Sequence, residues 1–400
     1  MTWTPIWALP NIKLDEPVES EFFALAPNDD KRVRRLTRRH PEFRKFLQRF
    51  TDVHKNRIHP ALILRREDAP KRLESLDAAV SFRDILVASI VPSASSRNLI
   101  YANLRNRASL STFFWVYPWM IDRNFEYAIA QTPTTMSLHD ASAINGQSSP
   151  ELIPINVSRQ DFDETLLQSL LERWTARYIN TMPTWENIAL FRSLNIANQA
   201  CQIPGDADAT IFDFGRIISL WVSAFETLVH PGENGRATLN EVYALLERVP
   251  WLDKRCGHRR FMTRAHKKQT RRNIACWIYN HIYDCRNDFL HGNPVNNSNL
   301  IIRRSGRPLI NFAPPLYRLG LTSFLELSIN KLPPPMTDTE AFATFCSESL
   351  IFEEPQRDAE NAIRWALTSV EEQERWKQDR IAESRERTRQ IKDSLNAPGS

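Results

Sequence analysis

The chain has 400 residues, a formal net charge of +5, and a composition of 42% hydrophobic and 25% charged residues. The composition is typical of a soluble globular protein, and the length predicts two or three domains. Its five cysteines are odd in number and widely spaced, which argues against a disulfide framework and for a reducing compartment. The first residues lack a signal-peptide pattern, and the longest apolar stretch, 113–121, is too short to cross a bilayer. We therefore expect a cytoplasmic protein with no membrane contact.

The first half predicts a charged, proline-rich lead-in over residues 1–70 and an α/β domain over residues 71–203. The lead-in contains one basic helix, 31–50. Three apolar runs rich in β-branched or aromatic residues have the character of strands, and two amphipathic stretches have the character of helices. The expected strands are 84–91, 111–117 and 125–130, and the expected helices are 161–179 and 183–200. No catalytic constellation stands out in this half.

The second half predicts an all-helical domain over residues 204–350, after a linker at 202–210, followed by a charged helix over 351–400. Asp213 is a suitable N-cap for a helix that ends at His230. A later helix over 272–290 carries an apolar stripe and stops at His291-Gly-Asn-Pro294. Further helices are expected at 239–249, 316–331, 337–349 and 357–395. The fold class is therefore α+β overall, with an α/β N-terminal region.

Two runs of basic residues indicate a partner that carries phosphates, such as RNA. The first lies between Lys254 and Arg272 and contains no acidic residue, and the second lies between Lys31 and Arg39. A solvated surface is the alternative for each run. Within the first run the candidate RNA-binding residues are Arg259, Arg260, Arg264, Lys267, Lys268, Arg271 and Arg272.

Several common catalytic and cofactor motifs are missing from the sequence. The ten glycines form neither a dinucleotide-binding nor a P-loop pattern, and no His-Glu-x-x-His or Gly-x-Ser-x-Gly occurs. Scattered cysteines and histidines match no zinc-ligand spacing, so we expect no metal and no cofactor. Those residues are Cys256, His258, His266, Cys276, His281 and Cys285.

One short motif remains, the Arg-x4-His of Arg286-Asn-Asp-Phe-Leu-His291. The same spacing also occurs at residues 35–40 and 49–54, so spacing alone is a weak signal. The third copy differs because it lies on the last turn of an aromatic amphipathic helix. An amide, Asn287, follows the arginine, and a Gly-Asn-Pro stop follows the histidine.

These residues resemble the signature of the HEPN superfamily, and the Apea-like HEPN group most of all. The resemblance covers residues 210–330, where Phe225-Glu-Thr-Leu228 is similar to an apolar-Glu-x-Leu element of that group. It implies a helical bundle that dimerises through the motif helices. Many members are metal-independent ribonucleases, often in a toxin or phage-defence context with a neutralising partner, and others are inactive and only bind.

The resemblance also implies roles for individual residues. Arg286 would bind the scissile phosphate, Asn287 would orient the histidine or the phosphate, and Glu226 would support them. His291 would act as general acid or base at the ribose 2′-hydroxyl, giving a 2′,3′-cyclic phosphate. The chemistry is reasonable, because histidine in general exchanges protons near neutral pH and arginine binds phosphate with two donors.

Helix geometry leaves alternatives open. Five residues of α-helix separate Arg286 and His291 by about 140° around the axis, so a second copy of the helix is a natural way to complete the site. Alternatively, His291 only caps the helix, and Arg286 only pairs with a carboxylate such as Glu226. The protein would then be a non-catalytic RNA- or nucleotide-binding protein, or a structural dimer.

Overall fold

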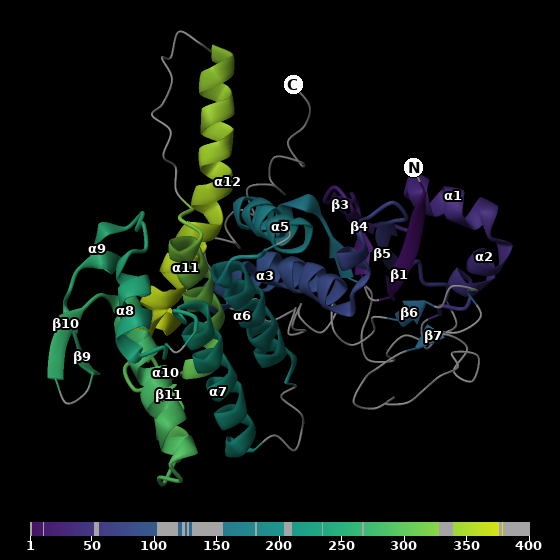
Figure 1. The fold of residues 1–400 in the computed structure, drawn as a ribbon. Helices are drawn as coiled ribbons and strands as arrows, with labels where there is room; N and C mark the ends of the chain where they lie inside the picture. The colour runs from purple at the N-terminus through teal and green to yellow at the C-terminus, as the bar shows by residue number, and fades with distance from the viewer. Residues whose placement is uncertain are drawn as a thin grey trace.

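The computed structural model describes residues 2–10, 12–51, 56–101, 119–121, 125, 128–129, 155–180, 182–203, 210–233, 235–265, 268–327, 339–375 and 378. Within these ranges the protein is a mixed α and β structure with an N-terminal sheet and a mostly helical remainder (Figure 1). The expected strand at 111–117, most of the expected linker and the end of the expected C-terminal helix lie outside the described residues.

The N-terminal residues form a sheet, so the expectation of an extended lead-in over residues 1–70 was wrong. The described strands of this sheet are all antiparallel, in the order β3-β4-β5-β1-β6-β7. Several of them are short, and prolines interrupt the sequence between them, which hid the alternating pattern of a sheet. The strands are β1 Trp3–Leu9, β3 Val18–Glu19, β4 Phe23–Ala26, β5 Ala61–Arg66, β6 Trp119–Ile121 and β7 Ala128–Ile129. A separate parallel pair joins β2 Ile12–Leu14 to β8 Ile155–Val157.

The two faces of the sheet are both buried. Along β5, Leu62 and Leu64 pack in one apolar cluster with α1 Lys31–Arg39 and α2 Pro41–Leu47, whereas Ile63 points into the main core. This alternation is the one expected of a strand covered on both sides. The basic run of α1 is partly internal, since Arg32 is buried and bonded to Asp30.

The longest helix of the N-terminal half, α3 Leu76–Tyr101, contains the run 84–91 that was expected to be a strand. A short apolar run does not distinguish a strand from a helix that is buried all round. α3 is the one described helix that is long and apolar enough to cross a membrane, but 78% of its apolar window is buried inside the molecule. It is therefore packed as a core helix (Figure 1).

The expected helices at 161–179 and 183–200 are confirmed, as α5 Glu164–Ile179 and α6 Trp185–Gln202, whereas the expected basic helix at 31–50 is divided into α1 and α2. The second half is not all helical: two hairpins interrupt it, β9 Phe261–Ala265 with β10 Lys268–Arg272, and β11 Ile301–Ile302 with β12 Arg307–Pro308. The expected break between 349 and 357 is also wrong, because α12 runs through it with Pro355 inside. The helices are α7 Ile211–Leu228, α8 Leu239–Glu247, α9 Lys254–Gly257, α10 Ile274–Leu290, α11 Ala313–Phe324 and α12 Thr339–Arg364.

One hydrophobic core crosses the boundary expected near residue 203. It contains side chains from the sheet, from α3, α5 and α6, and from α7, α8, α10, α11 and α12. The helices on the two sides of that boundary, α6 and α7, lie against each other, and α3 packs against α11 and α12. The two halves of the sequence therefore share their interior.

Candidate functional site

The candidate motif lies where α7 and α10 pack against each other in opposite directions. Phe225 near the end of α7 meets Tyr279 near the start of α10, with ring centroids 5.0 Å apart. At the other end, Gly215 of α7 lies under the ring of Phe289. The pair thus places the start of α7 beside the end of α10, where the motif histidine lies.

Local capping explains where both helices begin. Thr210 is the N-cap of α7 and forms a capping box with Asp213, so the expectation that Asp213 itself is the cap was off by one helical turn. Asn273 caps α10, with its side-chain oxygen accepting a 3.0 Å hydrogen bond from the backbone N–H of Cys276.

The structure brings together three of the four predicted catalytic and supporting residues. Nη1 of Arg286 donates a 3.0 Å hydrogen bond to Oδ1 of Asn287, and Nη2 lies 3.6 Å from a carboxylate oxygen of Glu226 on α7. The second distance is that of an ion pair and is too long for a good hydrogen bond. Arg286 therefore does pair with Glu226, as the structural alternative expected.

The Arg286 guanidinium keeps unused hydrogen-bonding capacity. Its side chain is 22% exposed, and its Nε is buried with no hydrogen-bond partner among the described residues. Burial raises the pKa of Glu226, and the positive charge of Arg286 opposes that rise without cancelling it. An anion that reached the guanidinium would compete with a carboxylate that is poorly solvated and only loosely held.

His291 stands apart from these three residues. It is the C-cap of α10 and is exposed, and no hydrogen bond or ion pair joins its imidazole to a described residue. The helix ends in a Schellman turn, in which Gly292 N–H donates to Phe289 and Asn293 N–H donates to Asp288. Gly292 has φ +68°, which is the conformation that this turn requires. His291 is therefore in the capping position of the structural alternative, with its ring free in solvent.

Two tyrosines that the motif did not indicate complete the surroundings of Arg286. Its Cζ lies 5.8 Å from the ring centroid of Tyr283. Tyr279 is fully buried with its hydroxyl unpaired among the described residues, and burial next to Glu226 raises its pKa well above the ordinary value. Both tyrosines precede Arg286 by helical spacings, three and seven residues, which is the only signal in the sequence that could have pointed to them.

Of the seven predicted RNA-binding residues, three contact other side chains, three are exposed without such a contact, and one lies outside the described residues. Arg259 and Arg272 both form 3.1 Å ion pairs with Glu247 of α8, and Arg272 also covers the ring of Tyr243. Nη2 of Arg260 lies at hydrogen-bond distance, 2.8 Å, from Nδ1 of His258. Arg264, Lys268 and Arg271 are exposed and have no ion pair with a described residue, whereas Lys267 lies outside the described residues.

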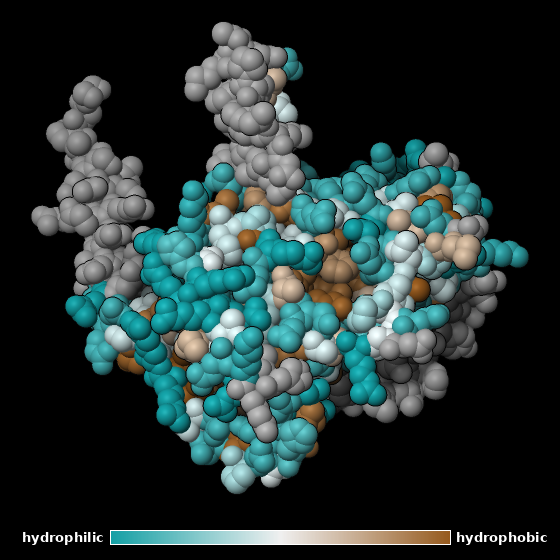
Figure 2. All heavy atoms as spheres, turned by 60° about the vertical axis from the view of Figure 1, so that its left-hand side comes forward, coloured by the Kyte–Doolittle hydropathy of each residue, from teal (hydrophilic) through white to brown (hydrophobic). Residues whose placement is uncertain are grey.

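The hairpin that carries these cations lies along α10. The ring of Phe261 stacks on Trp277, and the backbone N–H of Arg264 donates a 2.7 Å hydrogen bond to Asn280, one turn further along the helix. β9 therefore runs in the direction of the motif end of α10 (Figure 1). Figure 2, in which this side of the molecule comes forward, shows a mostly hydrophilic surface with small apolar patches.

No disulfide joins the described cysteines, which are Cys201, Cys256, Cys276 and Cys285. In the described part of the chain, no three His, Cys, Asp or Glu side chains gather as a metal-binding group. Comparisons with known proteins add no relative, since no family model, no curated protein and no solved structure matches the chain.

Proposed function

We propose that the protein binds RNA and cleaves it without a metal ion at the motif end of α10. The observation that carries the proposal is the Arg286 guanidinium, which Glu226 and Asn287 orient from two sides while the side chain stays 22% exposed. An exposed histidine follows on the terminating turn of the same helix, and a hairpin with three exposed cations runs toward it. A phosphate anchor, a proton carrier and a basic approach are the parts that such a reaction needs.

In the proposed reaction, His291 removes the proton of a ribose 2′-hydroxyl, whose oxygen then attacks the neighbouring phosphorus. The bond from phosphorus to the 5′-oxygen breaks, so the products are a 2′,3′-cyclic phosphate and a 5′-hydroxyl end, which takes up a proton. Arg286 binds the non-bridging phosphate oxygens and stabilises the charge that develops there. Asn287 and Glu226 are positioning residues that act through Arg286.

The separation of His291 from Arg286 around the helix favours a site completed by a second copy of the chain. Two large apolar side chains are exposed beside the motif: Leu290 is 59% exposed and Phe212, at the start of α7, is 71% exposed. Pairing two copies through this end would cover both side chains and bring two sets of motif residues together. Light scattering should show a homodimer that Leu290→Glu dissociates, and a wild-type monomer at high concentration would remove this part of the proposal.

The test is RNA cleavage by the full chain in EDTA, with single-stranded and structured RNAs as substrates. Arg286→Ala and His291→Ala should each reduce cleavage by 100-fold or more, on the order expected for loss of a phosphate contact or a proton-transfer group. Arg357→Ala, which breaks an exposed ion pair on α12, and His59→Ala, an exposed histidine, are the matched controls and should cleave normally. Cleavage that needs a metal, or that survives both motif substitutions, would contradict the proposed mechanism.

The second candidate function is RNA binding without cleavage, and two observations on the same residues favour it. Arg286 already has a carboxylate partner, and His291 already occupies a capping position. If the wild type cleaves no RNA, yet binds it with an affinity that depends on Lys268 and Arg271, the binding function replaces the catalytic one.

A further inference from the structure

A cavity of about 440 Å³ opens between α3, α6, α7 and the segment from β12 to the start of α11, and none of the predicted motif residues lines it. Its walls come from four stretches of sequence that are far apart. Those stretches contribute residues from Val91 to Leu99, from Ala200 to Ile203, Ile217 with Trp221, and from Arg307 to Pro314. The volume lies in the range of about 300–1,000 Å³ that is typical of small-molecule sites.

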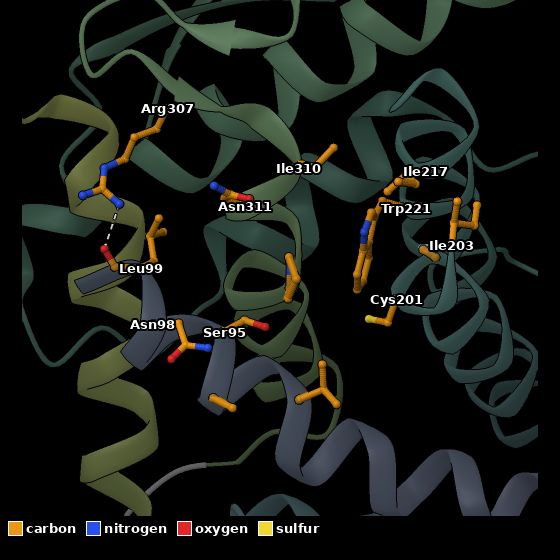
Figure 3. A pocket seen from close by; sticks show the side chains of 14 residues that line it. Ser95, Asn98, Leu99, Cys201, Ile203, Ile217, Trp221, Arg307, Ile310 and Asn311 are labelled. Carbon is orange, nitrogen blue, oxygen red and sulfur yellow. Dashed lines mark hydrogen bonds between the residues drawn. The ribbon is translucent and has the colours of Figure 1, made fainter. Parts of the chain in front are cut away.

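The two ends of this cavity differ in chemistry, as Figure 3 shows. One end is polar and cationic, and the other is apolar and aromatic. The polar end carries Arg307, Asn311, Asn98 and Ser95, and the apolar end carries Trp221, Ile217, Ile203 and Cys201.

Arg307 gives the polar end a positive charge that no carboxylate of the described residues neutralises. Its Nη1 donates a 2.8 Å hydrogen bond to the carbonyl of Leu99, and its Nε donates a 2.8 Å hydrogen bond to Oε1 of Gln373. Its Cζ also lies 4.7 Å from the ring centroid of Trp365. Both oxygens are neutral, and no carboxylate among the described residues pairs with the guanidinium.

Burial without a counter-charge is costly for a cation, and here it lowers the pKa of Arg307. The backbone carbonyl, the amide and the indole hold the guanidinium in one orientation, so little side-chain entropy would be lost when an anion binds. Arg307 is thus a fixed cation on a cavity wall, where an oxyanion would supply the missing charge.

We propose that this cavity binds a small organic anion, with a carboxylate or phosphate group on Arg307 and a flat apolar group against Trp221. Asn98 and Asn311 are exposed amides at the polar end, where they can donate to or accept from the polar part of the ligand. The indole of Trp221 is 2% exposed and forms part of the rigid apolar wall that such a group would contact. This site is separate from the RNA site and stands whether or not the chain cleaves RNA.

Isothermal titration of the full chain tests the proposal with two anionic probes and their neutral counterparts. The anions are adenosine 5′-monophosphate and indole-3-acetate, and the neutral molecules are adenosine and indole. At least one anion should bind in a 1:1 ratio and at least tenfold more tightly than its neutral counterpart. Binding of neither anion at millimolar concentration, or equal binding of the neutral counterpart, would overturn the proposal.

Substitutions then assign the binding to the cavity. Arg307→Gln keeps a polar amide but removes the charge, so the affinity for the anion should fall at least tenfold. Arg304→Gln is the matched control, because it removes an exposed arginine from the same hairpin, and it should leave the affinity unchanged. An anion that binds Arg307→Gln as tightly as the wild type is bound elsewhere, and the proposal fails.

Arg307→Gln removes contacts that stabilise the fold as well as the charge, so two further variants leave Arg307 in place. Asn311→Ala changes an exposed side chain and should weaken binding several-fold, and Ser95→Phe should occupy part of the cavity and weaken binding at least tenfold. Circular dichroism and thermal unfolding establish that each variant is folded. If folded Ser95→Phe and Asn311→Ala both bind the anion normally, the cavity is not the site.

Discussion

The carboxylate of Glu226 faces the guanidinium of Arg286 across the α7–α10 interface at 3.6 Å, a distance that gives an ion pair without a short hydrogen bond. Both side chains are more than three-quarters buried, at 23% and 22% exposure. The carboxylate therefore loses most of its hydration and gains only part of the attraction that a closer pair would give. Its raised pKa follows from that imbalance.

Glu226 should make the stability of the protein depend on pH in a defined direction. Because the pKa of the folded carboxyl is above the ordinary value of 4.5, the folded state binds more protons than the unfolded state between those two values. The free energy of unfolding should then fall as pH rises through that window, relative to Glu226→Gln. Urea denaturation from pH 4 to pH 8 measures the difference, with the exposed Glu233→Gln as control. A difference that grows in the opposite direction would show that the ion pair outweighs the loss of hydration.

The buried pair of Arg318 and Asp163 should be among the most sensitive contacts of the fold. Nε of Arg318 lies 2.9 Å from the Asp163 carboxylate, and the two side chains are 1% and 0% exposed. Arg318 also bonds to Gln356 of α12, so one guanidinium joins three helices. Arg318→Met leaves a buried carboxylate without its partner and should cost about 3–5 kcal/mol in thermal or urea unfolding. Arg357→Met, in an exposed pair, should cost less than about 1 kcal/mol. Similar costs for the two variants would argue against this role.

Gly215 should be required for the close approach of α7 and α10. A Cβ at this position would lie 2.5 Å from Cδ1 of Phe289, which is well inside contact distance. Overpacking in Gly215→Ala should lower the free energy of unfolding by about 1–3 kcal/mol. The higher helix propensity of alanine should offset roughly 1 kcal/mol of that loss. A double-mutant cycle with Phe289→Leu is the sharper measurement, since the smaller side chain should remove most of the cost. Additive effects of the two substitutions would mean that the contact is not the cause.

Salt dependence should separate the free cations of the hairpin from the paired ones. Arg271→Gln and Lys268→Gln should each reduce the slope of log Kd against log salt for single-stranded RNA by about 0.7, the value for one phosphate contact. Arg259→Gln should change the slope less, because Glu247 already neutralises Arg259. Equal slopes for all three variants and the wild type would place the RNA on another surface.

Strong local signals were enough to predict the elements that hold the motif. The apolar stripes and stop signals of α7 and α10 located both helices to within a few residues, and the pairing of Arg286 with Glu226 was foreseen as one alternative. α3 was misread because a helix buried on all sides loses its periodicity. The hairpin of β9 and β10 was missed because its strands carry exposed charges rather than an alternating apolar face.

The cavity beside Arg307 could not be predicted from the sequence at all. Its lining residues come from four distant segments, and none of those segments contains a recognisable binding motif. Only tertiary packing shows that Arg307 has neutral partners and that Trp221 lies at the opposite end. Burial without a counter-charge is a property of the folded state alone.

The shared interior also determines how the molecule comes apart. Cutting the chain near residue 203 would uncover the face of α7 that α6 covers and the faces of α11 and α12 that α3 covers, and it would separate Asp163 from Arg318. Neither fragment would retain a closed core, so the isolated C-terminal half is a poor substitute for the intact protein. Unfolding of the described core should accordingly be one cooperative event. A destabilising substitution in α3 should therefore also lower the stability of α10.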